Sequence, residues 1–311
     1  MEIFEQTNTT PEESPEPLEE QSPVLVQKRR SQGRIILDRF LHHRMASAGA
    51  IFLILLFLFC FLGPLVTGHN HPDDVGVAAP FAPASFQLPL GADDVGRDEF
   101  ARAMAGGQIS LLVGLSSMFV AIVLGVGIGA FAGYYGGIVD SLLMRITDTI
   151  LAIPLYLLLF VLSASFTNGS PLSVIFLIAI FGWTTAARLI RGEFLAQKER
   201  EYVLAAQTIG ARHFRLIFRH ILPNAAGPII VNATLQVGNN IILESILSYF
   251  GFGIKVPLAS WGSMVSAGQG FFDNNPGLVF IPGLLIFFTV LSCNLVGDGL
   301  RDALDPHMTE R

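Results

Sequence analysis

The amino-acid sequence predicts an all-α membrane protein with six transmembrane helices. Of its 311 residues, 51% are hydrophobic and only 14% are charged, a composition that is uncommon in soluble domains. Several apolar runs reach about 18 residues or more, enough to cross a hydrocarbon core about 30 Å thick as a helix. A basic segment, 188–223, interrupts these runs in the C-terminal half and is expected to lie outside the membrane.

The first predicted span ends at Gly63 and Pro64, before a polar segment. The third contains Pro154, which a membrane helix can tolerate. The second contains three glycines at four-residue intervals, Gly125, Gly129 and Gly133. This spacing favours close helix packing over a dinucleotide-binding loop, because no strand precedes it. The six predicted spans are 46–66, 109–134, 140–166, 172–189, 225–250 and 278–296.

The distribution of Lys and Arg predicts the orientation, because short loops rich in these residues stay in the cytoplasm. Six lie before the first span and seven in the 188–223 segment, whereas the opposite-face segments hold only Arg97, Arg102 and Lys255. We therefore expect a multi-pass protein of the plasma or inner membrane with both termini in the cytoplasm. The basic residues are Lys28, Arg29, Arg30, Arg34, Arg39, Arg44, Arg188, Arg191, Lys198, Arg200, Arg212, Arg215 and Arg219.

Four regions follow from these patterns. Residues 1–36 form an acidic, proline-containing cytoplasmic tail that is expected to be disordered. Residues 37–108 hold the first transmembrane helix and an extracytoplasmic loop, residues 109–300 hold the other five helices, and residues 301–311 form a C-terminal cytoplasmic tail. Cys60 and Cys293 fall in predicted spans, where packing is a better expectation than a disulfide.

Within the basic segment, residues 201–208 predict a short helix that places the small and apolar side chains Val203, Leu204, Ala205 and Ala206 on one face. Gly210 then permits a turn. A second short helix over 211–221 is expected to stop at Leu222 and Pro223. Physical reasoning alone leaves two interpretations open: a surface for a soluble partner, or an amphipathic helix resting on anionic lipid.

The same segment resembles the cytoplasmic signature of ATP-binding-cassette importer permeases: E-A-A, three residues, G, nine residues, I-x-L-P. Ala205, Ala206, Gly210, Leu222 and Pro223 occupy matching positions. Two positions depart from the pattern, since Leu204 stands where the family has Glu and His220 where it has Ile. Glu201, one turn before Leu204, is the candidate replacement for the missing carboxylate.

Three further stretches are similar to the C-type permease of dipeptide, oligopeptide and nickel importers: LDRFLHHRMASAGA, LPLGADDVGRDEFARAMAGGQISLLVG, and SYFGFGIKVPLASWGSMVSAGQGFF followed by NLVGDGLRDALDP. The resemblance implies half of a translocation pathway for di- or oligopeptides, with nickel or another small solute as the alternative cargo. It also implies three kinds of protein partner: a second permease in a heterodimer, two cytoplasmic ATPases, and an extracytoplasmic binding protein. That binding protein is expected to dock on 68–107 and 251–276.

No GxxxxGK phosphate-binding loop occurs in the sequence, so ATP hydrolysis is expected in the partner chains. This subunit is therefore predicted to be no enzyme, to carry no cofactor and to bind no nucleic acid. An intramembrane serine protease is disfavoured because every histidine lies outside the apolar runs. A secondary transporter remains the other rival, although such proteins usually carry charged residues in both halves.

Polar residues inside the fifth predicted span are the candidate pathway residues: Gln236, Asn240 and Glu244, with Asn239 nearby. A carboxylate at such depth must face protein or a water-filled path. Glu244 could therefore contact cargo or hold helices together, and both interpretations stay open. Arg145 and Asp148, near the cytoplasmic end of the third span, are expected to pair or to snorkel and not to contact cargo. The polar turn at 69–74 is expected to be a solvated loop and not a metal site.

Overall fold

The computed structural model describes residues 32–69, 71–166 and 168–304, and these form a helical bundle. Apart from a single β-bridge between Ala92 and Asp98, the described residues contain no strand. The α-helices are α1 (Gln32–His42), α2 (Arg44–Thr67), α3 (Glu99–Tyr135), α4 (Gly137–Leu151), α5 (Leu155–Phe166), α6 (Pro171–Lys198), α7 (Glu201–Thr208), α8 (His213–Arg215), α9 (Leu222–Asn224), α10 (Ala226–Tyr249), α11 (Trp261–Gln269) and α12 (Gly277–Leu304), and a π-helical turn, η1 (Leu216–Ile221), lies between α8 and α9.

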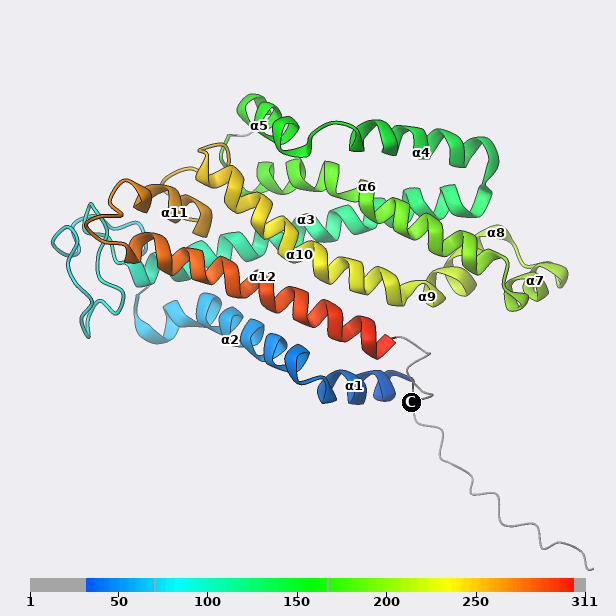
Figure 1. Cartoon of the computed structure of the whole chain (residues 1–311), viewed down its shortest axis with the longest axis horizontal. Helices are drawn as coiled ribbons and strands as arrows, with labels where there is room; N and C mark the ends of the chain where they lie inside the picture. The colour runs from blue at the N-terminus through cyan, green and yellow to red at the C-terminus, as the bar shows by residue number, and fades with distance from the viewer. Residues whose placement is uncertain (1–31, 70, 167, 305–311) are drawn as a thin grey trace, which may run out of the picture.

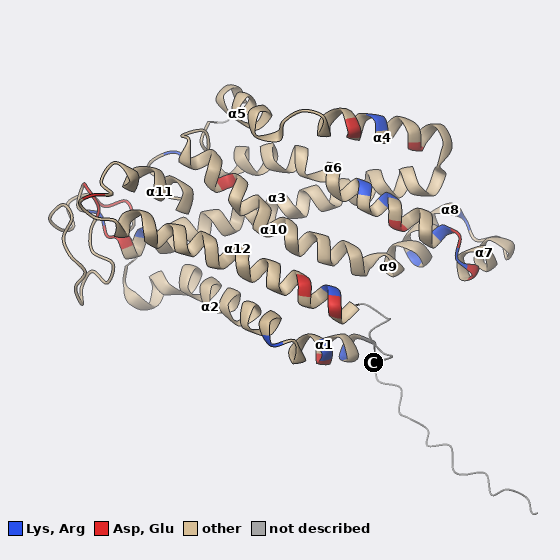
Figure 2. Cartoon of the chain, viewed as in Figure 1, with Lys and Arg blue, Asp and Glu red and all other residues tan. Residues whose placement is uncertain are grey.

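The long helices pack side by side (Figure 1): α6 and α10 contact α3, α12 contacts α10, and α2 contacts α12. One end of the bundle carries α1, the end of α12 and the α7–α9 segment, and the other end carries α11 and the loop that follows α2. Charged residues gather at these two ends, and the band between them is almost free of charge (Figure 2). This distribution is the one expected of a protein whose middle lies in hydrocarbon.

Four described helices are long and apolar enough to span a membrane: α2, α3, α6 and α12. The predicted third span is not one straight helix, because α4 and α5 are bent by 83° at residues 152–154. Pro154 causes the break, since proline lacks a backbone N–H and keeps the preceding residue out of the helical region. The bundle therefore has four candidate spans, or five if the bent pair counts as one.

The predicted fifth span corresponds to α10, whose 24 residues give a length of about 36 Å. Asn232, Gln236, Asn239, Asn240 and Glu244 lower its apolarity, and it is not among the four candidates. The count of six spans accordingly stays a prediction.

The glycine spacing on α3 is confirmed as a packing device against α6. A Cβ atom on Gly125 would lie 2.6 Å from the Cβ of Ala186, one on Gly129 2.5 Å from the carbonyl oxygen of Ala187, and one on Gly133 2.7 Å from the Cβ of Phe194. Side chains at these positions would force the two helices apart. The stripe thus holds α3 and α6 in direct backbone contact.

One of the region boundaries drawn from the sequence needs a correction, and the others stay predictions. Helix α1 begins at Gln32, so residues 32–36 are helical and not disordered, while residues 1–31 of the predicted tail lie outside the described part. Helix α3 begins at Glu99, ten residues before the predicted second span, because Asp98 caps it by accepting the N–H of Phe100 at 2.9 Å. Helix α12 continues to Leu304, into the predicted C-terminal tail, whose residues 305–311 are not described. Both cysteines are buried and unpaired, as expected.

Candidate functional sites: an exposed helical loop and a polar groove

The basic segment between α6 and α10 folds into two short helical pieces. Helix α7 ends at Thr208, and Gly210 has a φ of +83°, a left-handed conformation that glycine adopts without strain. The second piece does not stop at Leu222 and Pro223 as predicted. It continues through η1 and α9 towards α10.

A change of hydrogen-bond register explains how the helix passes Pro223. In η1 the N–H of Leu222 donates to the carbonyl of Ile217, five residues earlier. This π-type register widens the turn just before a residue that has no N–H to donate. Ala225 follows with φ −83° and ψ −3°, and its N–H donates to the carbonyl of Ile221 at 3.0 Å. Sequence reasoning treated proline as a stop signal and therefore missed this continuity.

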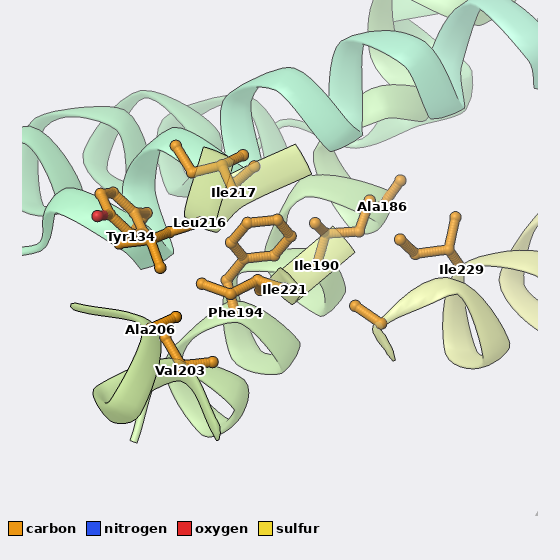
Figure 3. Close-up of a cluster of buried hydrophobic side chains, with 12 residues drawn as sticks. Tyr134, Ala186, Ile190, Phe194, Val203, Ala206, Leu216, Ile217, Ile221 and Ile229 are labelled. Atoms are coloured by element: carbon orange, nitrogen blue, oxygen red, sulfur yellow. The ribbon is translucent and has the colours of Figure 1, made fainter. Parts of the chain in front are cut away.

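The inner face of the loop is fixed to the bundle by a hydrophobic cluster (Figure 3). Val203 and Ala206 of α7 lie three residues apart on this face, and Leu216, Ile217 and Ile221 join them from η1. They pack against buried side chains of α3, α6 and α10, namely Ala130, Tyr134, Ala186, Ile190, Phe194 and Ile229. The loop is thus a packed part of the subunit.

Polar contacts add to this attachment. The hydroxyl of Tyr134, near the end of α3, lies 2.6 Å from Nδ1 of His213 in α8. Lys198 at the end of α6 donates to the carbonyl of Tyr134 at 2.8 Å. Sequence reasoning missed these contacts, because 79 residues separate Tyr134 from His213 and no local pattern relates them.

The outer face of the loop presents most of the predicted site residues to solvent. Glu201, Leu204, Ala205, Gly210 and Pro223 are exposed, and Leu222 is half-buried. Ala206 is only 6% exposed and lies with Val203 in the hydrophobic cluster, so the prediction that these two share one face with Leu204 and Ala205 is wrong. Successive helical residues are rotated by about 100°, which puts Ala206 below Val203 and turns Ala205 outwards.

A second candidate site is a groove in the face of the bundle, with a volume of about 630 Å³. The α4–α5 break at Pro154, helix α6 and helix α10 line it. The break that interrupts the predicted third span thus forms one wall. The lining of the other two walls includes uncharged polar residues, of which Thr184 and Asn240 are nearly buried: Thr184, Thr185, Asn232, Gln236, Asn239 and Asn240.

The structure separates the three predicted pathway residues. Gln236 lines the groove, donates its Nε2 to the carbonyl of Gly182 at 3.0 Å, and has an Oε1 with no partner among the described residues. Asn240 also lines it and donates to Ser117 Oγ at 2.9 Å. Glu244 has no exposed surface and does not line the groove. Its carboxylate accepts hydrogen bonds from Ser110 and Ser248, the helix-holding arrangement that the sequence left open.

Charged residues at the opposite end of the bundle pair with one another. Asp93 accepts a hydrogen bond from Arg97 Nε at 2.6 Å, and Arg102 lies 3.6 Å from Asp73. His69 contacts Asp98, which caps α3. These pairs tie the loop after α2 to the start of α3. Within the described residues no group of three or more His, Cys, Asp or Glu side chains could hold a metal ion.

Of the two alternatives for Arg145 and Asp148, the structure does not show the pairing. Asp148 instead accepts a hydrogen bond from Arg188 of α6 at 2.6 Å. Helix α4 lies against α6, which brings a closer cation to Asp148 than its neighbour on the same helix.

Comparison with known proteins identifies the family. Residues 125–310 match the family of the binding-protein-dependent transport system inner membrane component, and residues 31–84 match the N-terminal TM domain of oligopeptide transport permease C. The oligopeptide transport system permease protein OppC of Bacillus subtilis is 38% identical over 270 residues, covering 87% of this chain and 88% of that protein.

Other relatives agree with this match. The dipeptide transport system permease protein DppC of Bacillus subtilis is 38% identical over 271 residues, covering 87% of this chain and 84% of that protein. The glutathione transport system permease protein GsiD of Pectobacterium atrosepticum is 36% identical, covering 92% and 95%.

Solved structures support the same fold. A structure of the MetNI methionine ABC transporter in an inward-facing conformation is similar with a TM-score of 0.55, at 16% identity, over 66% of this chain and 97% of that chain. A second crystal form gives a TM-score of 0.52 at 18% identity, over 64% and 95%. The chain therefore belongs to the family of binding-protein-dependent transport system inner membrane components.

Proposed function

We propose that this chain is one permease subunit of an ATP-driven importer and forms half of a translocation pathway for di- or oligopeptides. Relatives named as oligopeptide and dipeptide permeases cover most of the chain and support this cargo. In this proposal the subunit is not a catalyst. Two cytoplasmic ATPase subunits hydrolyse ATP, a second permease completes the pathway as a heterodimer, and an extracytoplasmic binding protein delivers the cargo.

One observation carries the mechanical part of the proposal: the exposed outer face of α7 belongs to a helix whose inner face packs in the hydrophobic cluster shared with α3, α6 and α10. Leu204 and Ala205 face outwards from α7, while Val203 and Ala206 on the same helix are buried in that cluster. A soluble partner that binds the outer face in one of its states but not in another would bias the position of all three helices. Gly210, whose surroundings are open, leaves room for close approach.

The groove supplies a surface suited to peptide backbone. Gln236, Asn239 and Asn240 line it, and each side-chain amide has both donor and acceptor atoms, like the peptide group itself. An uncharged wall of this kind can pair with backbone amides whatever side chains the peptide carries. Imidazole is a preferred ligand of nickel, and the groove lining holds no histidine among the described residues, so the lining favours peptide over metal as the cargo.

The orientation follows from charge. The end of the bundle that carries α7 also carries α1 and the end of α12 (Figure 1). The Lys and Arg residues of the 188–223 segment lie in α6 and in the loop that follows it, and such residues favour the cytoplasmic side. We therefore place α7 and both chain ends in the cytoplasm. The 68–107 and 251–276 segments then face the binding protein.

The proposal is tested by purifying the tagged protein in mild detergent and identifying the chains that accompany it. The expected result is a second permease and two ATPase chains, and peptide uptake by vesicles that stops when ATP is withheld. A Gly210→Trp variant should lose the ATPases, because the indole would occupy the approach surface, whereas Gly192→Trp on the open side of α6 should retain them. A wild-type protein that purifies alone and takes up solute from an ion gradient would instead be a secondary transporter.

A further inference from the structure

A buried carboxylate near the C-terminal end of α10 is bonded to hydroxyl groups. The Oε1 atom of Glu244 accepts a hydrogen bond from Ser248 Oγ at 2.6 Å, and its Oε2 atom accepts one from Ser110 Oγ at 2.8 Å. Ser248 lies one turn later on α10, whereas Ser110 belongs to α3. No ion pair to Glu244 is present in the part of the chain that the structure describes. The carboxylate therefore joins two helices through neutral donors.

Each serine also accepts a backbone N–H from the segment that follows α10. Ser248 Oγ accepts from Ile254 at 3.0 Å, and Ser110 Oγ accepts from Trp261 at 3.2 Å. A hydroxyl group can donate one hydrogen bond while it accepts another. Both ends of the 254–261 segment are thus linked, each through one serine, to the two oxygens of the same carboxylate.

The two ends of the 254–261 segment are also closely packed against α3 and α10. Trp261 is completely buried, and its Nε1 donates to the carbonyl of Ala103 at 2.9 Å. A Cβ atom on Gly253 would overlap Ser248 Oγ, and one on Gly262 would overlap the carbonyl oxygen of Ser245. Glycine at both positions lets the backbone of the segment approach α10 closely enough for these hydrogen bonds.

The middle of the segment has the opposite character. Lys255 and Val256 are exposed, and Val256 is 80% accessible. Residues 254–261 lie within the surface that the proposed function assigns to the binding protein. A surface that is fixed at both ends and exposed between them keeps its shape before its partner arrives, which lowers the entropic cost of binding.

We propose that Glu244 is a positioning residue for the 254–261 segment, which it holds in the conformation that the extracytoplasmic binding protein recognises. This role rests on the proposed function. It differs from contact with cargo, because Glu244 is buried away from the groove that Gln236 and Asn240 line. Since Asn240 lies one turn earlier on α10, the same helix carries the groove and the anchor of the docking segment.

The test compares Glu244→Gln, Ser110→Ala and Ser248→Ala in the assembled transporter. The matched control is Thr289→Ala, which removes a buried hydroxyl on α12 that donates to the carbonyl of Leu285 on the same helix. Hydrogen–deuterium exchange is measured on peptides that contain Ile254 or Trp261. Activation of ATP hydrolysis is measured against the concentration of the transporter's extracytoplasmic binding protein, purified separately.

Each variant should give its own exchange pattern. Ser248→Ala should speed exchange at Ile254, Ser110→Ala at Trp261, and Glu244→Gln at both, by about tenfold for each lost buried hydrogen bond. The half-saturating concentration of binding protein should rise by a similar factor while the maximal rate is kept. The Thr289→Ala control should change neither quantity.

Three outcomes would overturn the proposal. Unchanged exchange at both sites in Glu244→Gln would show that the carboxylate does not anchor the segment. Faster exchange with unchanged half-saturation would show that the anchor does not serve docking. A uniform rise in exchange over all helices in Glu244→Gln and in both serine variants would show a general packing role in place of a local anchor. If the binding protein does not change the ATPase activity of the wild-type transporter, the proposed function fails. The exchange pattern still tests whether Glu244 anchors the 254–261 segment.

Discussion

Arg191 of α6 forms a bidentate ion pair with Asp140 of α4. Its Nε lies 2.5 Å from Oδ1 and its Nη2 lies 2.6 Å from Oδ2. Helix α4 has only one buried residue, Thr147, so burial of apolar side chains contributes little to its packing against the bundle. The ion pair is therefore a principal attachment of the first turn of α4, and α4 ends at the break that forms one wall of the groove.

Replacement of Asp140 by Asn is expected to destabilise the protein by about 1–3 kcal/mol, because a hydrogen-bonded, partly buried charge loses its partner. The matched control is Asp148→Asn. Its pair with Arg188 is more than half exposed on both sides and should contribute less than about 1 kcal/mol. Thermal unfolding in detergent measures both changes. Equal losses in the two variants would contradict the role given to the Asp140 pair.

The glycine stripe of α3 predicts a sharp positional difference. Gly129→Ala should lower the unfolding temperature, since overpacking against the backbone of α6 costs about 1–3 kcal/mol. Gly127 lies two residues away on the same helix, and a methyl group added there would meet no atom within 4 Å. Gly127→Ala should therefore leave stability unchanged or raise it slightly. Similar thermal shifts in both variants would argue against direct α3–α6 backbone contact.

Adjacent alanines of α7 should behave differently. Ala206→Leu adds bulk to a packed cluster and is expected to destabilise the subunit by about 1–3 kcal/mol. Ala205→Leu adds the same atoms to an exposed surface, so stability should be kept while the recovery of ATPase chains falls. Thermal unfolding and co-purification together separate the two effects. Loss of the ATPases without loss of stability in Ala206→Leu would mean that the inner and outer faces have been exchanged.

Glu201 and Leu204 allow a test of the departure from the family signature. Both are exposed and lie three residues apart on α7, so their side chains point to the same side. If Glu201 supplies the carboxylate that the signature normally places at 204, Glu201→Gln should reduce ATPase activity in the assembled transporter several-fold. The double variant Glu201→Gln with Leu204→Glu should restore it. If Leu204→Glu does not restore activity to Glu201→Gln, then Glu201 does not replace the signature carboxylate, and Leu204 marks a functional departure from the family signature.

Periodicity and spacing were sufficient to predict much of the fold. The α3 glycines required only their four-residue spacing, because close helix packing in a membrane depends on small residues at that interval. The break at Pro154 was missed because proline is tolerated in many membrane helices, and whether neighbouring residues restore the helix depends on contacts distant in sequence. The π-helical turn before Pro223 was missed for the same reason.

The candidate sites show a similar division. The position of Gly210 in a turn could be predicted, because only its own backbone decides it. The inward direction of Ala206 depends on contacts with Phe194 and Ile221, which the loop sequence does not reveal. Glu244 and Gln236 looked alike as polar residues in an apolar run. Glu244 is enclosed because serines on α3 and α10 bond to its carboxylate. Gln236 lines a groove because the α4–α5 break leaves space beside it.

The passage of helical turns through Pro223 leaves little coil between α7 and α10. From His213 to Tyr249 the chain is helical except for a bend at Ala225, and a hydrophobic cluster fixes α7 to this segment. A displacement of α7 would therefore reach the start of α10 with little irregular backbone to absorb it. Under the proposed function, residues that stiffen this segment would tune the response of the transporter to its ATPases, even where they touch neither ATP nor cargo.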